Sequence, residues 1–217
     1  MERLLWDGEG RRRIPPAAGF DRAAARLPRG TLLRICELNA QAPIYLVPTR
    51  PFLRALAGRI RACGARTVLE VAAGDGHLAR SLQEVAPDLS VLATDSGAWS
   101  RPRARMSPRE RRAFRGKRIA GLPPGADVLR LDATLAIRML QPDLVLASWL
   151  PPGPLLRRIV RAAPVVLEIG AGSGITGDIR CWRYPHEFCE DLDVLSRCRL
   201  DERPALRLHT RVTLYQR

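Results

Sequence analysis

The chain has 217 residues, which is enough for one domain with a sizeable hydrophobic core. Its composition, 46% hydrophobic and 27% charged, is ordinary for a globular protein, and no apolar run approaches the length of a membrane-spanning helix. The first thirty residues lack the apolar centre of a signal peptide and carry acids that transit peptides avoid. Five scattered cysteines favour reduced thiols and a cytoplasmic location.

The formal net charge of +14 is distributed unevenly. Lys117 is the only lysine, so nearly all of the basic residues are arginine. Residues 96–118 contain nine basic residues and one acid, and therefore carry a net charge of +8. Such a segment can attract nucleic acid or another polyanion through Arg101–Arg118, or it can be a solvated insert. The sequence leaves both interpretations open.

Residues 1–48 show few periodic signals and are interpreted as an N-terminal extension. Residues 49–217 are interpreted as the main domain, with the basic insert at residues 96–118. Thr49 can cap a helix that has Pro51 in its first turn, and Gly64 ends the apolar stripe that follows.

From residue 67 onward, short apolar runs alternate with helical patterns. The predicted strands are Thr67–Val71, Leu89–Thr94, Asp127–Leu131, Leu144–Ala147 and Val165–Ile169. The predicted helices are His77–Ala86, Ala133–Leu140, Leu155–Ala162 and His186–Arg197, and Leu206–Leu214 alternates like an edge strand. This alternation predicts an α/β fold: a doubly wound, mostly parallel sheet with an antiparallel C-terminal edge strand and helices on both faces.

The turn after the first predicted strand, Glu70-Val-Ala-Ala-Gly-Asp-Gly76, is the most informative segment of the chain. Gly74 and Gly76 allow a sharp turn and a close approach of the backbone to a ligand. Asp95 ends the next strand, nineteen residues after Gly76, where it can accept hydrogen bonds from a ribose. These features predict a site for a nucleotide-like ligand at the carboxyl ends of the strands.

Glu70-x-Ala72-x-Gly74-x-Gly76 followed by Asp95 resembles the cofactor motif of class I S-adenosylmethionine-dependent methyltransferases. The family pattern is acidic-x-Gly-x-Gly-x-Gly, so Ala72 departs from it, and alanine fits there if its φ stays negative. The resemblance implies S-adenosyl-L-methionine as cofactor, bound by Glu70, Ala72, Gly74, Asp75, Gly76 and Asp95, with Asp132 and Ala133 contacting the adenine. Asp132 is also a candidate N-cap of the helix that follows it.

A second glycine motif, Glu168-Ile-Gly-Ala-Gly-Ser-Gly174, fits the family pattern without a departure, and Asp193 follows it at the same spacing. No apolar strand leads to Asp193, however, and few residues remain after it. The motif is therefore interpreted as the fifth strand and its loop. A permuted methyltransferase, with the cofactor motif here, is the alternative.

The segment Ser148-Trp-Leu-Pro-Pro-Gly153 follows the fourth predicted strand. It resembles the substrate motif of amino-methylating members of the family, with the aromatic residue before the prolines and Leu150 inserted. It can also be simply a rigid loop. The candidate catalytic residues on the ligand side of the sheet are Ser148, Trp149, Asp178 and His186. No metal site is expected, because Cys181, His186, Cys189 and Cys198 lack a zinc-knuckle spacing.

The resemblance predicts an S-adenosylmethionine-dependent methyltransferase whose acceptor the sequence does not name. A nitrogen on nucleic acid, protein or a small molecule is the suggested target. The alternative is a catalytically inactive module of the same fold that docks RNA or a ribonucleoprotein through its arginine-rich insert. A nicotinamide-dependent oxidoreductase is disfavoured, because the glycine spacing differs from Gly-x-Gly-x-x-Gly. Expected partners are a methyl acceptor and nucleic acid, with no membrane.

Overall fold

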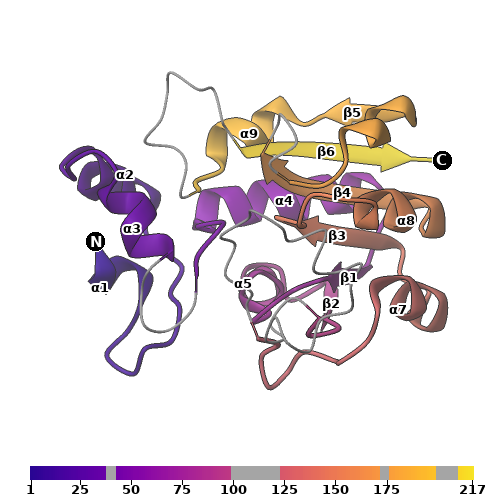
Figure 1. Cartoon of the computed structure of the whole chain (residues 1–217), viewed down its shortest axis with the longest axis horizontal. Helices are drawn as coiled ribbons and strands as arrows, with labels where there is room; N and C mark the ends of the chain where they lie inside the picture. The colour runs from indigo at the N-terminus through magenta and orange to yellow at the C-terminus, as the bar shows by residue number, and fades with distance from the viewer. Residues whose placement is uncertain (38–42, 99–122, 172–175, 199–209) are drawn as a thin grey trace.

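The computed structural model describes residues 1–37, 43–98, 123–171, 176–198 and 210–217. Its centre is a six-stranded sheet with the order β2-β1-β3-β4-β6-β5 (Figure 1). The strands are β1 Thr67–Val71, β2 Ser90–Thr94, β3 Leu144–Ser148, β4 Val165–Ala171, β5 His186–Phe188 and β6 Thr210–Gln216. β1 to β4 are parallel to one another, and β6 is antiparallel to both β4 and β5.

Helices cover both faces of this sheet. They are α4 Arg50–Ala62, α5 His77–Val85, α7 Ala133–Leu140, α8 Leu155–Ala162, α9 Glu190–Leu195 and the 3-10 helix η2 Ile179–Arg183. α4 packs against α5 and α9, and their buried residues belong to one apolar cluster. α7 and α8 pack together and belong to the cluster on the other face. The fold class predicted from the sequence, doubly wound α/β, is confirmed.

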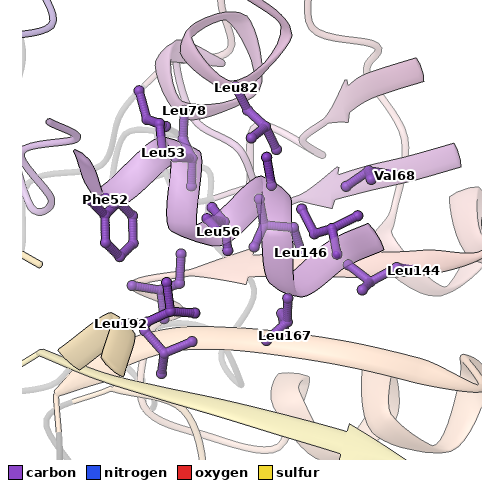
Figure 2. Packing of buried hydrophobic residues seen from close by; sticks show 14 of the residues in the cluster. Phe52, Leu53, Leu56, Val68, Leu78, Leu82, Leu144, Leu146, Leu167 and Leu192 are labelled. Atoms are coloured by element: carbon purple, nitrogen blue, oxygen red, sulfur yellow. The ribbon is translucent and has the colours of Figure 1, made fainter. Parts of the chain in front are cut away.

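The apolar runs of the central strands explain why the sheet is covered twice. In β3, Leu144 and Leu146 join the cluster under α4, while Val145 and Ala147 join the cluster under α7 and α8. Successive side chains of a strand point to opposite faces, so an uninterrupted apolar run requires a cover on each side. Figure 2 shows the first cluster, with labelled side chains of α4 lying against those of the strands beneath it.

The C-terminal strand lies inside the sheet, so the prediction that it forms the edge is wrong. β6 pairs with β4 on one side and β5 on the other, which leaves β5 at the edge. The burial of β6 on both faces explains its position inside the sheet, because Val212 and Leu214 join one core cluster and Tyr215 joins the other. The first residues of the predicted strand, 206–209, lie outside the described residues.

The predicted helix His186–Arg197 is correct only in its second half. His186–Phe188 forms β5 instead, and the helix α9 begins at Glu190. Phe188 is opposite Thr213 of β6, and an aromatic residue favours such a pleated position. β5 occupies the position beside the last strand.

The predicted third strand, Asp127–Leu131, is absent from the sheet. Only an isolated bridge joins Leu129 to Thr94. Val128 is buried, but Leu129 is 46% exposed, so this segment has too little cover to continue the sheet beyond β2. The apolar pattern therefore predicted a full strand where the structure has a single bridge to the end of β2.

The N-terminal segment forms three helices, α1 Glu2–Leu5, α2 Ala17–Ala25 and α3 Thr31–Glu37. They surround a small apolar cluster that includes Trp6, Phe20 and Val47. The segment is attached to the rest of the chain by the Val47 amide, which donates to the Arg197 carbonyl (2.8 Å), and by an ion pair between Arg197 and Asp21. Figure 1 shows these helices in indigo beside the sheet. The division at residue 48 stays a prediction.

Among the described residues, no helix has the length and apolar character needed to cross a membrane.

Gly76 offers a test of local packing at the start of α5. Its φ is +71°, and a Cβ there would lie 2.7 Å from Cγ2 of Val128. Gly64 has a similar φ of +73° with open space around it, so Gly64→Ala isolates the backbone cost. We expect Gly64→Ala to lower the free energy of unfolding by about 1 kcal/mol and Gly76→Ala by about 2–3 kcal/mol, measured by urea denaturation. Equal losses would mean that Val128 moves aside freely.

Candidate functional site

A cavity of about 210 Å³ lies at the carboxyl ends of β1, β2 and β3. The loops that follow parallel strands meet at one edge of the sheet, which is where α/β proteins bind ligands. Of the cofactor residues predicted from the sequence, the cavity is lined by Glu70, Ala72, Gly74, Asp75 and Asp95. Of the predicted acceptor residues, it is lined by Ser148 and Trp149. The structure therefore brings two separately predicted motifs to one cavity.

Asp95 fixes the shape of the glycine turn. One carboxylate oxygen accepts a hydrogen bond from the Gly74 amide (2.9 Å), and the other accepts from the Gly97 amide (2.7 Å). The side chain is buried yet lines the cavity. Each carboxylate oxygen has two acceptor sites, so both retain capacity for a ligand hydroxyl.

The backbone of the turn is more contorted than the sequence suggested. Ala72 has a φ of +52°, so the condition under which alanine fits this position, a negative φ, is not met. Gly74 has a φ of +56°, which glycine adopts easily. A non-glycine residue in this region costs about 1–3 kcal/mol, and such strain concentrates at ligand sites. The turn therefore holds Ala72 in a conformation that the rest of the fold must stabilise.

Glu70 is a buried acid beneath the turn. Its Oε2 accepts a hydrogen bond from the Ala79 amide (2.8 Å) in the first part of α5. Burial raises the pKa of Glu70 to about 8, more than the hydrogen bond lowers it. Burial therefore favours the protonated form of Glu70 at neutral pH, although Arg12 and Arg80 act in the opposite direction.

The opposite wall of the cavity comes from the N-terminal segment, through Arg12, Tyr45, Leu46 and Pro48. Arg12 forms an ion pair with Asp75 (3.4 Å), and its Nη2 donates to the Leu46 carbonyl (3.0 Å). Sequence reasoning missed these residues, because no periodic or spacing signal connects residues 12 and 45 to the glycine motif. His77, which also lines the cavity, was missed although it directly follows Gly76.

The loop after β3 presents an aromatic side chain to the cavity. Trp149 has a φ of +51°, and its amide donates to the Ile169 carbonyl (2.7 Å), which fixes the start of the loop. Its ring stacks with that of Tyr45, with centroids 5.9 Å apart and planes at 26°. Pro151 and Pro152 continue the lining. This part of the site suits a flat or apolar group.

Five of the predicted site residues do not line this cavity. Asp132 caps α7 through the amides of Thr134 and Leu135 (2.9 and 3.3 Å), which confirms the N-cap interpretation, and Ala133 is buried in the core behind it. Asp178 lines a separate cavity of about 20 Å³. His186 lines neither; its Nδ1 lies 2.9 Å from the Tyr184 carbonyl oxygen, and its ring packs on Phe188. Gly76, the N-cap residue of α5, shapes the turn without lining the cavity.

The second glycine motif does not form a comparable site among the described residues. Glu168 lies at the smaller cavity, where its Oε2 accepts a hydrogen bond from the Tyr215 hydroxyl (3.1 Å) and burial raises its pKa to about 7. Asp193 lines neither cavity and accepts from the Val212 amide (2.6 Å). The rest of the motif, 172–174, lies outside the described residues, and so does the basic insert from residue 99 to 118. No metal-binding cluster of His, Cys, Asp or Glu is found in the described ranges.

No protein-family model matches the chain, and no curated protein matches it either. Among solved structures, the chain is similar to the methyltransferase domain of bacterial CtHen1 (TM-score 0.44, 9% identity, covering 76% of this chain and 97% of that one). It is also similar to magnesium protoporphyrin IX methyltransferase from Synechocystis PCC 6803 with bound S-adenosylhomocysteine (TM-score 0.41, 10% identity, coverage 92% and 95%). A third is the plantazolicin methyltransferase BpumL (TM-score 0.40, 11% identity, coverage 77% and 85%). All three TM-scores lie below 0.5, and these similarities do not establish a function for the chain.

Glu70 predicts a pH dependence of stability. An acid whose pKa is raised on folding holds its proton in the folded state, so its contribution to stability falls as pH rises from its unfolded pKa of 4.5 towards 8. Relative to Glu70→Gln, the wild type should therefore lose up to about 1.4 kcal/mol of unfolding free energy per pH unit between pH 5 and 8. Denaturant titrations at several pH values measure this difference. Glu84→Gln, a change at an exposed glutamate of α5, is the control. A difference in unfolding free energy between the wild type and Glu70→Gln that does not change with pH would contradict the prediction.

Proposed function

We propose that the chain is an S-adenosylmethionine-dependent methyltransferase. The observation that carries the proposal is the meeting of Glu70, the Gly74 turn and Asp95 with Ser148 and Trp149 around one cavity at the carboxyl ends of the central strands. One half of this cavity carries the acidic groups of a cofactor motif, and the other carries an aromatic acceptor loop.

Residues that line the cavity can be matched to the separate chemical groups of S-adenosylmethionine. Asp95 would accept hydrogen bonds from the ribose hydroxyls, since it retains acceptor capacity and faces the cavity. Glu70, buried at the cavity, would lose its proton and become an anion beside a bound cation. Ser96 and Ala98, which line the cavity beyond Asp95, would contact the base. Asp132 and Ala133, assigned to the adenine from the resemblance, are not needed.

When bound, S-adenosylmethionine supplies a methyl group already activated on a sulfonium. The chain then has to position the acceptor in line with that methyl group and exclude water. Trp149 and Tyr45 would hold a flat acceptor, and Ser148 would orient a polar atom on it. This assignment keeps Ser148 and Trp149 as site residues. It gives no role to Asp178 or His186, which lie outside the cavity.

Two expectations from the sequence stay predictions. Nucleic-acid binding through Arg101–Arg118 concerns residues that the structure does not describe, and nothing in the structure tests the cytoplasmic location. The inactive-module alternative has no specific observation in its favour, and the cofactor cavity would be unnecessary in a scaffold.

Asp95 provides the test of the cofactor assignment. Asp95→Asn keeps the size of the side chain but removes its charge and one acceptor oxygen, so the affinity for S-adenosylmethionine should fall about tenfold or more. Calorimetry with S-adenosylmethionine, S-adenosylhomocysteine and NAD measures this and identifies the preferred ligand. Asp193→Asn is the matched control, because that carboxylate also accepts from a backbone amide. Loss of binding in the control alone would favour the permuted motif instead.

Trp149 provides the test of the acceptor side. Trp149→Ala should lower methyl transfer by about tenfold or more while cofactor affinity changes little, because only the orientation of the acceptor is lost. The measurement follows the labelled methyl group of S-adenosylmethionine into pools of RNA, protein and small metabolites. Trp182→Ala is the control, since Trp182 lines only the smaller cavity. Full transfer by Trp149→Ala would show that the acceptor binds elsewhere.

A further inference from the structure

One end of the cavity is formed by two polar side chains that belong to neither sequence motif, Arg12 and His77. Arg12 comes from the N-terminal segment, and its side chain is only 13% exposed. Nη1 donates a hydrogen bond to the Asp75 carboxylate, and Nη2 donates one to the Leu46 carbonyl. A guanidinium has five N–H donors, so this fork can donate further hydrogen bonds to an anion.

The side chain of His77 also points to a ligand, independently of Arg12. Its Nε2 is buried and has no hydrogen-bond partner in the described structure. The ring also interacts with the backbone of Arg13, and burial together with Arg12 keeps the pKa of His77 well below its usual range. The imidazole is therefore neutral. A ring whose other nitrogen donates to a backbone carbonyl leaves Nε2 as an acceptor. A buried acceptor without a donor usually awaits a water or a ligand.

The Arg12 guanidinium and the neutral His77 ring together match the two charged groups of an α-amino acid. Arg12 suits a carboxylate, and the neutral Nε2 of His77 suits an N–H donor such as an ammonium. An α-amino acid presents both groups on adjacent atoms. We propose that Arg12 and His77 bind the amino-acid end of the cofactor, with Arg12 donating to its carboxylate and His77 accepting from its ammonium. This inference rests on the proposed function, because it presumes an S-adenosylmethionine-like ligand.

The proposal makes the N-terminal segment part of the cofactor site. Asp75 of the glycine turn and the Leu46 carbonyl hold the Arg12 guanidinium at the cavity from two sides. The contact with Asp75 ties the segment to the turn, and the contact with Leu46 lies within the segment. A bound carboxylate would add a further contact between the segment and the site, and it would partly neutralise a buried cation.

Calorimetry with two nucleosides tests the proposal. S-adenosylhomocysteine has the amino-acid end, and 5′-methylthioadenosine has the same nucleoside and thioether without it. Arg12→Gln should weaken S-adenosylhomocysteine by about tenfold or more and 5′-methylthioadenosine by less than about twofold, because only the first ligand loses a charge-assisted contact. Arg158→Gln is the matched control, since it removes an exposed ion pair with Asp132 and neither residue lines the cavity.

A second pair of variants separates binding from folding. His77→Phe should weaken only S-adenosylhomocysteine, and His77→Gln, which restores an acceptor, should recover part of that loss. Equal weakening of both ligands in Arg12→Gln would show that Arg12 only holds the segment in place, and would overturn the proposal. Unchanged affinity for both would overturn it as well. In either case binding by the wild type would leave the proposed function standing, whereas failure of the wild type to bind either nucleoside would reject both.

Discussion

The carboxylate of Asp95 is the constraint on which the site depends. It receives amides from the turn after β1 and from the loop after β2, so one side chain joins the ends of two neighbouring strands. The joined loops fix where Gly74 lies, and through it the direction in which α5 begins. A ligand that engages Asp95 would therefore meet a shape already set by the backbone, and little ordering would be needed at binding.

The central strands and their helices could be predicted closely, because their signals are local. β1 has the predicted bounds, and α7 begins at Ala133 directly after its Asp132 cap. The C-terminal part was harder, because whether a strand lies at an edge depends on its partners and not on its own pattern. Thr210–Gln216 has buried residues on both faces, and β5 pairs with it on the side away from β4. His186–Phe188, just three residues long, carries too few positions for its periodicity to be recognised.

The site residues also divide into those that the sequence could predict and those that it could not. Glu70, Gly74 and Asp95 could be found because a strand, a turn and a helix follow one another in the sequence at a fixed spacing. Arg12 and Tyr45 could not, because they reach the cavity through tertiary contacts of a segment without periodicity. Asp178 and His186 were predicted from proximity to the correct edge of the sheet. The side chain of Asp178 instead caps η2 by accepting from the Arg180 amide, and His186 packs with Phe188 and Tyr215.

The position of β6 has a consequence for how the chain acquires its structure. Residues 165–171 of β4 and 186–188 of β5 are not hydrogen-bonded to each other, and both pair with a strand that begins only at residue 210. During synthesis, β5 has no neighbour in the sheet until that later strand arrives. Contacts of such separation in sequence are slow to form. Until then, one edge of β4 is open to pairing with other chains, and this half of the sheet is where misassembly would begin.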